Sequence, residues 1–405
     1  MGGVDVELSE DESGVALAFE EMLARESSIE RVRAAETAGF DPALWKVLTG
    51  VGAVTMALPE EAGGAGGGLV ALVLAAEAAG RHLACVPLVE AATAGLVLAA
   101  AGNGLGGDST SGRASSGGRT GGSGTGELAS AIAEAGGDGP PTVLAPSPAR
   151  DGVAVAVPGG AAAVAVVALD GDELVLVHGA PPGGGGDLGY LAVASRSLRG
   201  DGVRRTVLAT GDRAGELWDS ALGWWRIGTA ATCAGLAVRA IEIGAGYART
   251  RHQFGVPIGS FQAIQQMLVD PAMAADGALL LAREAAWRYD NGLASWRAAA
   301  DIAYAQAAEA AVRAAEACLH VHGGYGYTLE YDAQLYLRRA KALLLLGGDP
   351  EAIWAGIGAA SMSGEATDEA GPGQEGNAQA GADRVEAGQA VPERDGTGGA
   401  KRGGH

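Results

Sequence analysis

The spacing of apolar residues divides the chain into helical and strand-like stretches. Within residues 5–101, apolar side chains recur at i, i+3, i+4 and i+7 in "ESGVALAFEEMLAR", "DPALWKVLTG" and "LVALVLAAEAAGRHL". This pattern predicts amphipathic helices, interrupted by a glycine loop at residues 59–68. Between about residues 140 and 218 the pattern changes to short Val- and Leu-rich runs such as "VAVAVPGG" and "ELVLVHG", each closed by Gly, Pro or Asp. These runs predict an antiparallel sheet or a small barrel.

The second half of the chain is again helical in pattern. From Trp218 to about Met362, alanine-rich stretches follow one another, and one predicted helix starts near Arg226. Breaks are predicted at "GVPIGS", "DPAM", "YDNG", "HGGYGYTLEYD" and "GGDP". The predicted fold class is mainly α with a small central β domain. The expected organisation is an N-terminal helical domain, a flexible Gly/Ser-rich insertion, a middle β domain, a C-terminal helical bundle and a disordered tail, at residues 1–101, 102–126, 127–218, 219–362 and 363–405.

Composition and charge narrow the class of protein. A chain of 405 residues with 48% hydrophobic content is long enough for two or three domains. The sequence contains no run of about 18 apolar residues, the length that a membrane-spanning helix needs. The net charge of −20 leaves no electrostatic footprint for nucleic acid or an anionic membrane. The acidic start has no signal-peptide pattern. Three scattered cysteines favour a reducing cytoplasm over a disulfide framework.

A polar cluster in "TRHQFGVPIGSFQAIQ", residues 250–265, lies between two predicted helices. Arg251 comes at the end of the first helix, Ser260 is a candidate N-cap of the next, and Gln262 falls in its first turn. Arg251 and Gln262 are therefore expected to face one spot beside a helix N-terminus, which suits a phosphate. The alternative interpretation is a polar interhelical turn with an N-cap.

A second motif, "HVHGGYGYT", begins at His320. Gly323, Gly324 and Gly326 allow a ligand to approach the backbone closely, and no predicted strand precedes them, so the motif is not a dinucleotide-binding fingerprint. A plain interhelical loop is the alternative. His320 and His322 are poor candidates for metal ligands, because no Cys, Asp or Glu lies at a suitable spacing.

These two motifs together resemble the acyl-CoA dehydrogenase family. The resemblance is carried by "ARTRHQFGVPIGSFQAIQQMLVD" and "HVHGGYGYTLEYDAQLYLRRAK", and is supported by "LPEEAGGAGGGLVALVLAAEAAGRHLACVPL" near the N-terminus. It implies an N-terminal helical domain, a middle β-barrel and a C-terminal four-helix bundle. It also implies an FAD flavoprotein that oxidises the Cα–Cβ bond of an acyl-CoA thioester, assembles as a dimer or tetramer, and passes electrons to an electron-transfer flavoprotein.

The resemblance also implies which residues contact cofactor. In the family, the matching Arg and Gln contact the FAD of the neighbouring subunit, an aromatic packs beside them, and the glycine motif touches the same nucleotide. The candidate cofactor-binding residues are Arg251, Gln253, Phe254, Gln262, His320, Gly323 and Gly324.

The catalytic base of the family has no counterpart. Abstraction of the α-proton needs a carboxylate. Aligned on Lys341, the usual base position holds Gly347, and the alternative position used by a minority of the family holds Trp225. Asp349 and Glu351 are fallback candidates, although solvated residues at a helix start are the simpler interpretation. The middle domain also lacks the family's Thr-Glu-Pro-like and Trp-x-Ser/Thr runs, which hold the flavin ring.

Three hypotheses follow from this pattern of retained and missing residues. The favoured one is a non-catalytic subunit that completes the FAD site of a homologous catalytic subunit in a mixed oligomer, as in some enzymes of steroid-degrading bacteria. The alternative is a self-sufficient acyl-CoA dehydrogenase with a displaced carboxylate base. The third is a homomeric relic with neither flavin nor partner.

Overall fold

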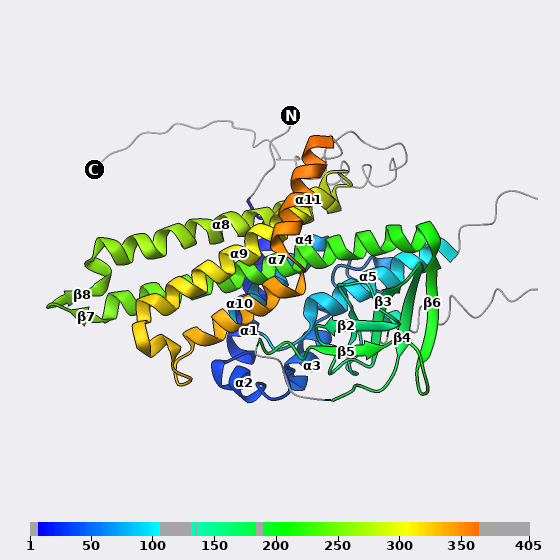
Figure 1. Ribbon diagram of the computed structural model, residues 1–405, viewed down its shortest axis with the longest axis horizontal. Coiled ribbons are helices and arrows are strands. Elements are labelled where there is room, and N and C mark those ends of the chain that lie inside the picture. Colours follow the sequence, from blue (N-terminus) through cyan, green and yellow to red (C-terminus); the bar gives the residue numbers. More distant parts are fainter. Residues whose placement is uncertain (1–6, 106–130, 134–135, 184–188, 364–405) are drawn as a thin grey trace, which may run out of the picture.

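A computed structural model describes residues 7–105, 131–133, 136–183 and 189–363 of the chain. Long helices run side by side, and a small β domain packs against one end of them (Figure 1). Most of the insertion expected at residues 102–126 and nearly all of the tail expected at 363–405 lie outside the described residues.

Five helices form the N-terminal part of the fold. They are α1 (Glu10–Glu26), α2 (Ile29–Ala34), α3 (Pro42–Gly50), α4 (Gly68–Arg81) and α5 (Leu88–Leu105). A capping box starts α1: the Ser9 hydroxyl accepts a hydrogen bond from the Glu12 N–H, and the Glu12 carboxylate accepts one from the Ser9 N–H. Helix α5 continues to Leu105, past the domain end expected at residue 101.

The β domain follows in the chain. Its strands are β1 (Thr142–Leu144), β2 (Val153–Val157), β3 (Ala165–Asp170), β4 (Glu173–His178), β5 (Ala194–Ser197) and β6 (Arg204–Thr210). A four-stranded sheet has the order β1-β3-β4-β6, and β2 pairs with β5. Most strand pairs are antiparallel, as predicted, but β1 runs parallel to β3. The intervening strand β2 lies in the other sheet, so the chain crosses over before it reaches β3.

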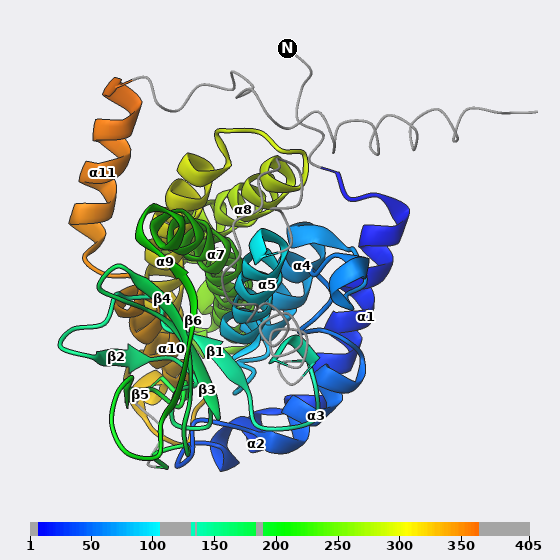
Figure 2. The same ribbon diagram turned by 90° about the vertical axis from the view of Figure 1, so that its right-hand side faces the viewer.

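The C-terminal part consists of long helices. They are α7 (Gly211–Thr250), α8 (Gln262–Asp290), α9 (Trp296–His322), α10 (Ala333–Leu346) and α11 (Pro350–Ser363). Helix α7 is central and packs on α4, α5, α8 and α9, whereas α11 projects away from the helical body (Figure 2). By length and a mean hydropathy of 1.2, α7 could cross a membrane, but 67% of its apolar window is buried, as in the core helix of a globular protein.

Small residues let these helices approach closely. A Cβ atom on Gly80 of α4 would overlap the Thr232 carbonyl of α7, and one on Gly235 of α7 would overlap the Glu77 carbonyl of α4. Asp290 adds a polar link, because its carboxylate accepts hydrogen bonds from Leu69 N and Val70 N at 2.8 and 3.0 Å. The last residue of α8 thereby caps the first turn of α4, which ties the two helical regions together.

The structure corrects two predicted helix boundaries. The helix expected to start near Arg226, in a domain expected to start at residue 219, begins at Gly211, directly after β6. Ala214 and Leu217 extend its buried face toward the β domain. The break expected at "DPAM" does not occur, because α8 runs through Pro271. Leu268 and Ala275 are buried on either side of this proline, so packing overrides its helix-breaking tendency.

Candidate functional site

A short hairpin connects α7 to α8. Strands β7 (His252–Gln253) and β8 (Val256–Pro257) pair antiparallel, and the tip residues Phe254 and Gly255 both have left-handed φ values, of 53° and 83°. This combination is typical of a tight two-residue hairpin turn. The predicted Ser260 cap was wrong: Phe261 takes the N-cap position of α8 without a capping side chain, and the Ser260 hydroxyl donates to the Pro257 carbonyl.

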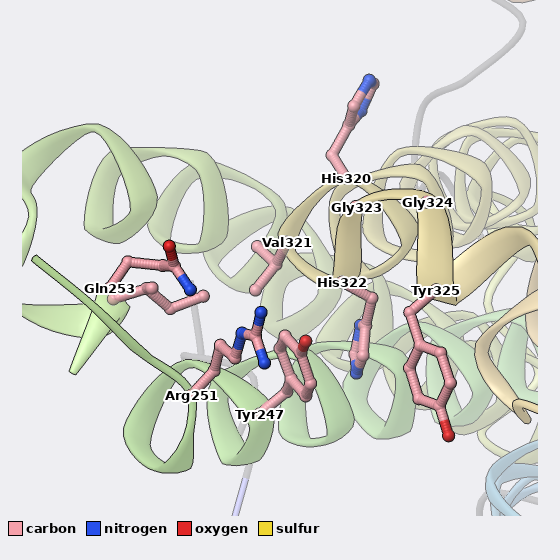
Figure 3. Close-up of a pocket in the computed structure, with 10 residues that line it drawn as sticks. Tyr247, Arg251, Gln253, His320, Val321, His322, Gly323, Gly324 and Tyr325 are labelled. Carbon is pink, nitrogen blue, oxygen red and sulfur yellow. The ribbon is translucent and has the colours of Figure 1, made fainter.

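A cavity of about 690 Å³ lies between this hairpin and the end of α9. The ends of α7 and α9, strand β7 and the glycine turn supply its walls, and the residues concerned are Tyr247, Arg251, Gln253, Ile258, His320, Val321, His322, Gly323, Gly324 and Tyr325. Figure 3 shows Arg251, Tyr247, His322 and Tyr325 arranged along one side, whereas the His320 side chain points away from them. The structure therefore brings the two motifs together at one cavity.

Arg251 supplies a cationic group to the cavity, and this group is unpaired in the described part of the chain. Its backbone is held at the end of α7, where its N–H donates to the Tyr247 carbonyl at 2.9 Å and its carbonyl accepts from Ile258 N–H at 2.8 Å. Among the described residues, its guanidinium has no hydrogen-bond or ion-pair partner. An unpaired guanidinium beside a cavity suits a phosphate or carboxylate, since it offers two parallel donors.

The glycine turn exposes backbone to the same cavity. Gly323 ends α9 with a φ of 62°, which disfavours any other residue, and a Cβ atom at Gly323 or Gly324 would meet nothing within 4 Å. The backbone at this turn is therefore open to a ligand. Phe254 and Gln262 are exposed and do not line the cavity, although both lie beside it on the hairpin and in the first turn of α8.

Gly347, the position predicted to correspond to the usual base of the family, is closed by a tyrosine. Gly347 ends α10 with an ordinary φ of −82°, but a Cβ atom there would overlap the hydroxyl and ring of Tyr304. Tyr304 is 1% exposed, and its hydroxyl donates to the Leu343 carbonyl at 2.8 Å. Burial raises the pKa of this phenol well above its usual range. No side chain, and so no carboxylate, fits at residue 347 while Tyr304 holds this position.

Residue 225, predicted to correspond to the alternative base position, is filled by a buried side chain as well. The Trp225 indole is fully buried, 5.6 Å from the Tyr304 ring between centroids, and its Nε1–H donates to the Glu90 carboxyl at 3.1 Å. Burial raises the pKa of Glu90, while the Trp225 hydrogen bond opposes this shift. Tyr304 therefore packs against both residue 225 and residue 347, and Glu90 is hydrogen-bonded to the first of them.

The fallback carboxylates lie elsewhere. Asp349 and Glu351 are both exposed at the start of α11, and the Asp349 carboxylate accepts a hydrogen bond from Glu351 N–H at 3.1 Å. This is the geometry of a residue that caps a helix start. Within the described residues, no group of three or more His, Cys, Asp and Glu side chains is placed to hold a metal ion.

Comparisons with known proteins decide the family. Residues 9–104 match the profile of the acyl-CoA dehydrogenase N-terminal domain, and residues 216–362 match that of the C-terminal domain. The chain is similar to acyl-CoA dehydrogenase FadE27 of Mycobacterium tuberculosis, with 33% identity over 330 residues that cover 76% of this chain and 85% of that protein. The chain belongs to the acyl-CoA dehydrogenase family.

Solved structures of acyl-CoA dehydrogenases have the same fold. A variant of the Tcur3481–Tcur3483 steroid ACAD superposes with a TM-score of 0.73 at 26% identity, over 88% of this chain and 99% of that one. The ChsE4–ChsE5 complex from Mycobacterium tuberculosis superposes with a TM-score of 0.72 at 24% identity, over 89% and 99% of the two chains. The predicted family and fold class are thereby confirmed.

Acyl-CoA dehydrogenases are FAD-dependent and oxidise acyl-CoA thioesters. The cavity around Arg251 and the region around Trp225 and Tyr304 fit that cofactor differently. The unpaired Arg251 and the open glycine turn suit the phosphates of a dinucleotide. By contrast, Trp225 is buried at one of the two positions where the sequence predicts that the base of the family is missing, and the buried Tyr304 closes the other.

Two important residues escaped the sequence analysis. Tyr304 sits in an alanine-rich helix with no motif around it, and only the Gly347 contact reveals its role. Glu90 carried a usable signal, since it is the one charged residue in the apolar stretch "PLVEAATAGLVLAAA". A carboxyl buried in such a stretch needs a hydrogen-bonding partner.

Proposed function

We propose that this chain is the non-catalytic subunit of a mixed acyl-CoA dehydrogenase oligomer, in which it completes the FAD site of a homologous catalytic subunit. The observation that carries the proposal is a contrast within one chain. The cavity around Arg251 is open and has an unpaired cation, whereas Tyr304 and Trp225 close both positions from which a base would act. The heteromeric ChsE4–ChsE5 complex among the structural neighbours is compatible with such an assembly.

In this proposal, the residues of the chain bind cofactor and perform no proton transfer. FAD supplies the hydride acceptor of the family reaction. The Arg251 guanidinium would pair with a phosphate of this cofactor, and the backbone at Gly323 and Gly324 would contact the nucleotide. The α-proton is taken by a carboxylate of the catalytic partner. Gln253 lines the same cavity and would lie beside the nucleotide. Phe254 and Gln262 lie outside the cavity and the His320 side chain points away from it, so these three residues would contact the cofactor only from its edge.

The test is to co-purify the chain with a catalytic partner and to compare the wild type with Arg251→Ala. A charge-assisted hydrogen bond of about 1.5–3 kcal/mol predicts FAD binding weaker by roughly ten- to a hundred-fold, with partial rescue by excess FAD. Arg249→Ala is the matched control, because within the described residues this exposed arginine donates only to the Ala245 backbone carbonyl of its own helix. Unchanged FAD affinity of Arg251→Ala in an intact mixed oligomer would contradict the proposal.

A second candidate function is a self-sufficient acyl-CoA dehydrogenase with a displaced base. The observation in its favour is Glu90, a buried carboxyl with a raised pKa beside Trp225. Groups with such perturbed pKa values are often catalytic. Turnover of an acyl-CoA by the chain alone, abolished by Glu90→Gln, would establish this function. Absence of turnover alone, with activity in the mixed oligomer, would favour the first proposal.

We further propose that the assembly acts in lipid or steroid catabolism in the cytoplasm, on an acyl-CoA thioester. The name of the steroid ACAD neighbour suggests the substrate class. The cysteines Cys85, Cys233 and Cys318 are all buried and form no disulfide with one another, which fits a reducing compartment. Electron-transfer flavoprotein is the expected acceptor by analogy with the family.

A further inference from the structure

His322 has an unusual environment at the end of α9. It is 4% exposed, it lines the Arg251 cavity, and its imidazole lies between two aromatic rings. Its ring centroid is 4.1 Å from that of Tyr247 on α7 and 4.5 Å from that of Tyr331, which follows the glycine turn. Tyr325 extends this aromatic cluster, 4.9 Å from Tyr331. Three separate segments of the chain therefore meet at one imidazole.

Both nitrogens of His322 are hydrogen-bonded, and their partners assign the tautomer. Nδ1 lies 2.6 Å from the Cys318 carbonyl, which can only accept, so Nδ1 carries the proton. Nε2 lies 2.9 Å from the Tyr331 hydroxyl and accepts a hydrogen bond from it. Burial lowers the pKa of His322, with the Cys318 carbonyl acting in the opposite direction. The ring in this tautomer is neutral, and both of its nitrogens take part in hydrogen bonds.

The glycine turn packs closely against His322. The chain reverses at Gly323, and the following 3₁₀ turn, Gly323–Tyr327, folds back over α9. A Cβ atom at Gly326 would stand 2.8 Å from His322 Cβ and 3.0 Å from the Leu319 carbonyl, so only glycine allows the turn to lie this close. The position of His322 therefore determines where the backbone of Gly323 and Gly324 meets the cavity.

We propose that His322 is the positioning residue of the cofactor cavity, clamping the glycine turn to α7 and to Tyr331. The clamp consists of the Nδ1–H bond to Cys318, the Tyr331 O–H bond to Nε2, and the stack on Tyr247. It holds the backbone of Gly323 and Gly324 at the wall of the cavity that Arg251 also lines. The identity of that ligand rests on the proposed function, whereas the clamp itself is a property of this chain.

The first test needs no cofactor. Amide hydrogen exchange of residues 323–328 is measured in the wild-type chain and in Tyr331→Phe and His322→Phe. Both variants keep aromatic stacking and lose hydrogen bonds, so exchange of this turn should accelerate about five- to a hundred-fold, with α4 and α10 unchanged. Tyr327→Phe is the matched control, since its hydroxyl belongs to the same turn, its side chain is 61% exposed, and it has no part in the clamp.

Conservative replacements separate the two hydrogen bonds. In His322→Asn the amide can still donate to the Cys318 carbonyl, and in His322→Gln it can still accept from Tyr331. Each should recover part of the protection that His322→Phe loses. Exchange of residues 323–328 that is the same in His322→Phe, Tyr331→Phe and the wild type would overturn the proposal.

A second measurement links the clamp to the ligand. In the mixed oligomer, Tyr331→Phe should weaken FAD binding about five-fold or more and leave the partner's kcat at saturating FAD unchanged. If Arg251→Ala leaves FAD affinity unchanged while the exchange results hold, the proposed function fails and the clamp stands. If Arg251→Ala weakens FAD binding and the exchange results fail, the clamp alone is wrong.

Discussion

Gly347→Ala adds only one methyl group, but we expect it to lower the free energy of unfolding by several kcal/mol, about 2–6. The added Cβ atom would overlap the hydroxyl and ring of Tyr304, which is buried and cannot swing into solvent. Forcing an extra methyl group into a packed site costs about 1–3 kcal/mol. Displacing Tyr304 also breaks its hydrogen bond to the Leu343 carbonyl, which adds about 1–3 kcal/mol for a buried polar group left unpaired. The backbone adds no strain, because φ at Gly347 is −82°.

Urea unfolding followed by far-ultraviolet circular dichroism measures this cost. A loss of about 2–6 kcal/mol lowers the unfolding midpoint by about 0.7–2 M, for a urea m value of about 3 kcal/mol/M. Gly356→Ala in α11 is the matched control, because its Cβ would meet nothing within 4 Å. It should stabilise its helix by about 0.5–1 kcal/mol. In a Tyr304→Leu background, the cost of Gly347→Ala should shrink by at least about 1 kcal/mol. An equal cost in both backgrounds would refute the argument that Tyr304 closes the base position.

Two further predictions concern buried polar groups. Trp225→Phe should lower the free energy of unfolding by about 1–3 kcal/mol, because Glu90 loses its indole donor in the core; a smaller loss in a Glu90→Leu background would confirm the pairing. Burial raises the pKa of Asp290 to about 6, above its value in the unfolded chain. The folded chain therefore binds the extra proton between about pH 4 and 6, and this contribution to stability is lost as pH rises through 6. Unfolding free energies measured from pH 4 to 7 should show the wild type losing stability relative to Asp290→Asn, and parallel curves would disprove the assignment.

Much of the architecture could be predicted from local sequence patterns. Apolar residues at helical spacing identified the helices that became α1, α3 and α4, and Val-rich runs ended by glycine identified the β domain. Both patterns succeed because side-chain periodicity follows directly from backbone geometry. The predicted break at Pro271 was wrong because packing, which a local pattern does not describe, decides the outcome there. A local helix-breaking tendency of about 3 kcal/mol is outweighed when packing on both sides of the residue holds the helix together.

The candidate site was predictable in part. The sequence by itself determined the family, the two motifs and the absence of a carboxylate at residues 347 and 225. These are statements about residue identity in one stretch of chain, which needs no folding to be recognised. It did not separate the residues that line the cavity from Phe254 and Gln262, which lie beside it.

Only the tertiary structure decided what replaced the missing base and what shapes the cavity. Tyr304 closes the space at Gly347 across a sequence separation of 43 residues, and Glu90 meets Trp225 across 135. His322 likewise acquires its tautomer and its role from Tyr247 and Tyr331, which lie on other segments. Contacts of this kind depend on how helices cross and how closely their small residues allow them to approach. Local periodicity specifies which face of each helix is buried, but which side chain meets which across the interface is set by packing of the whole chain.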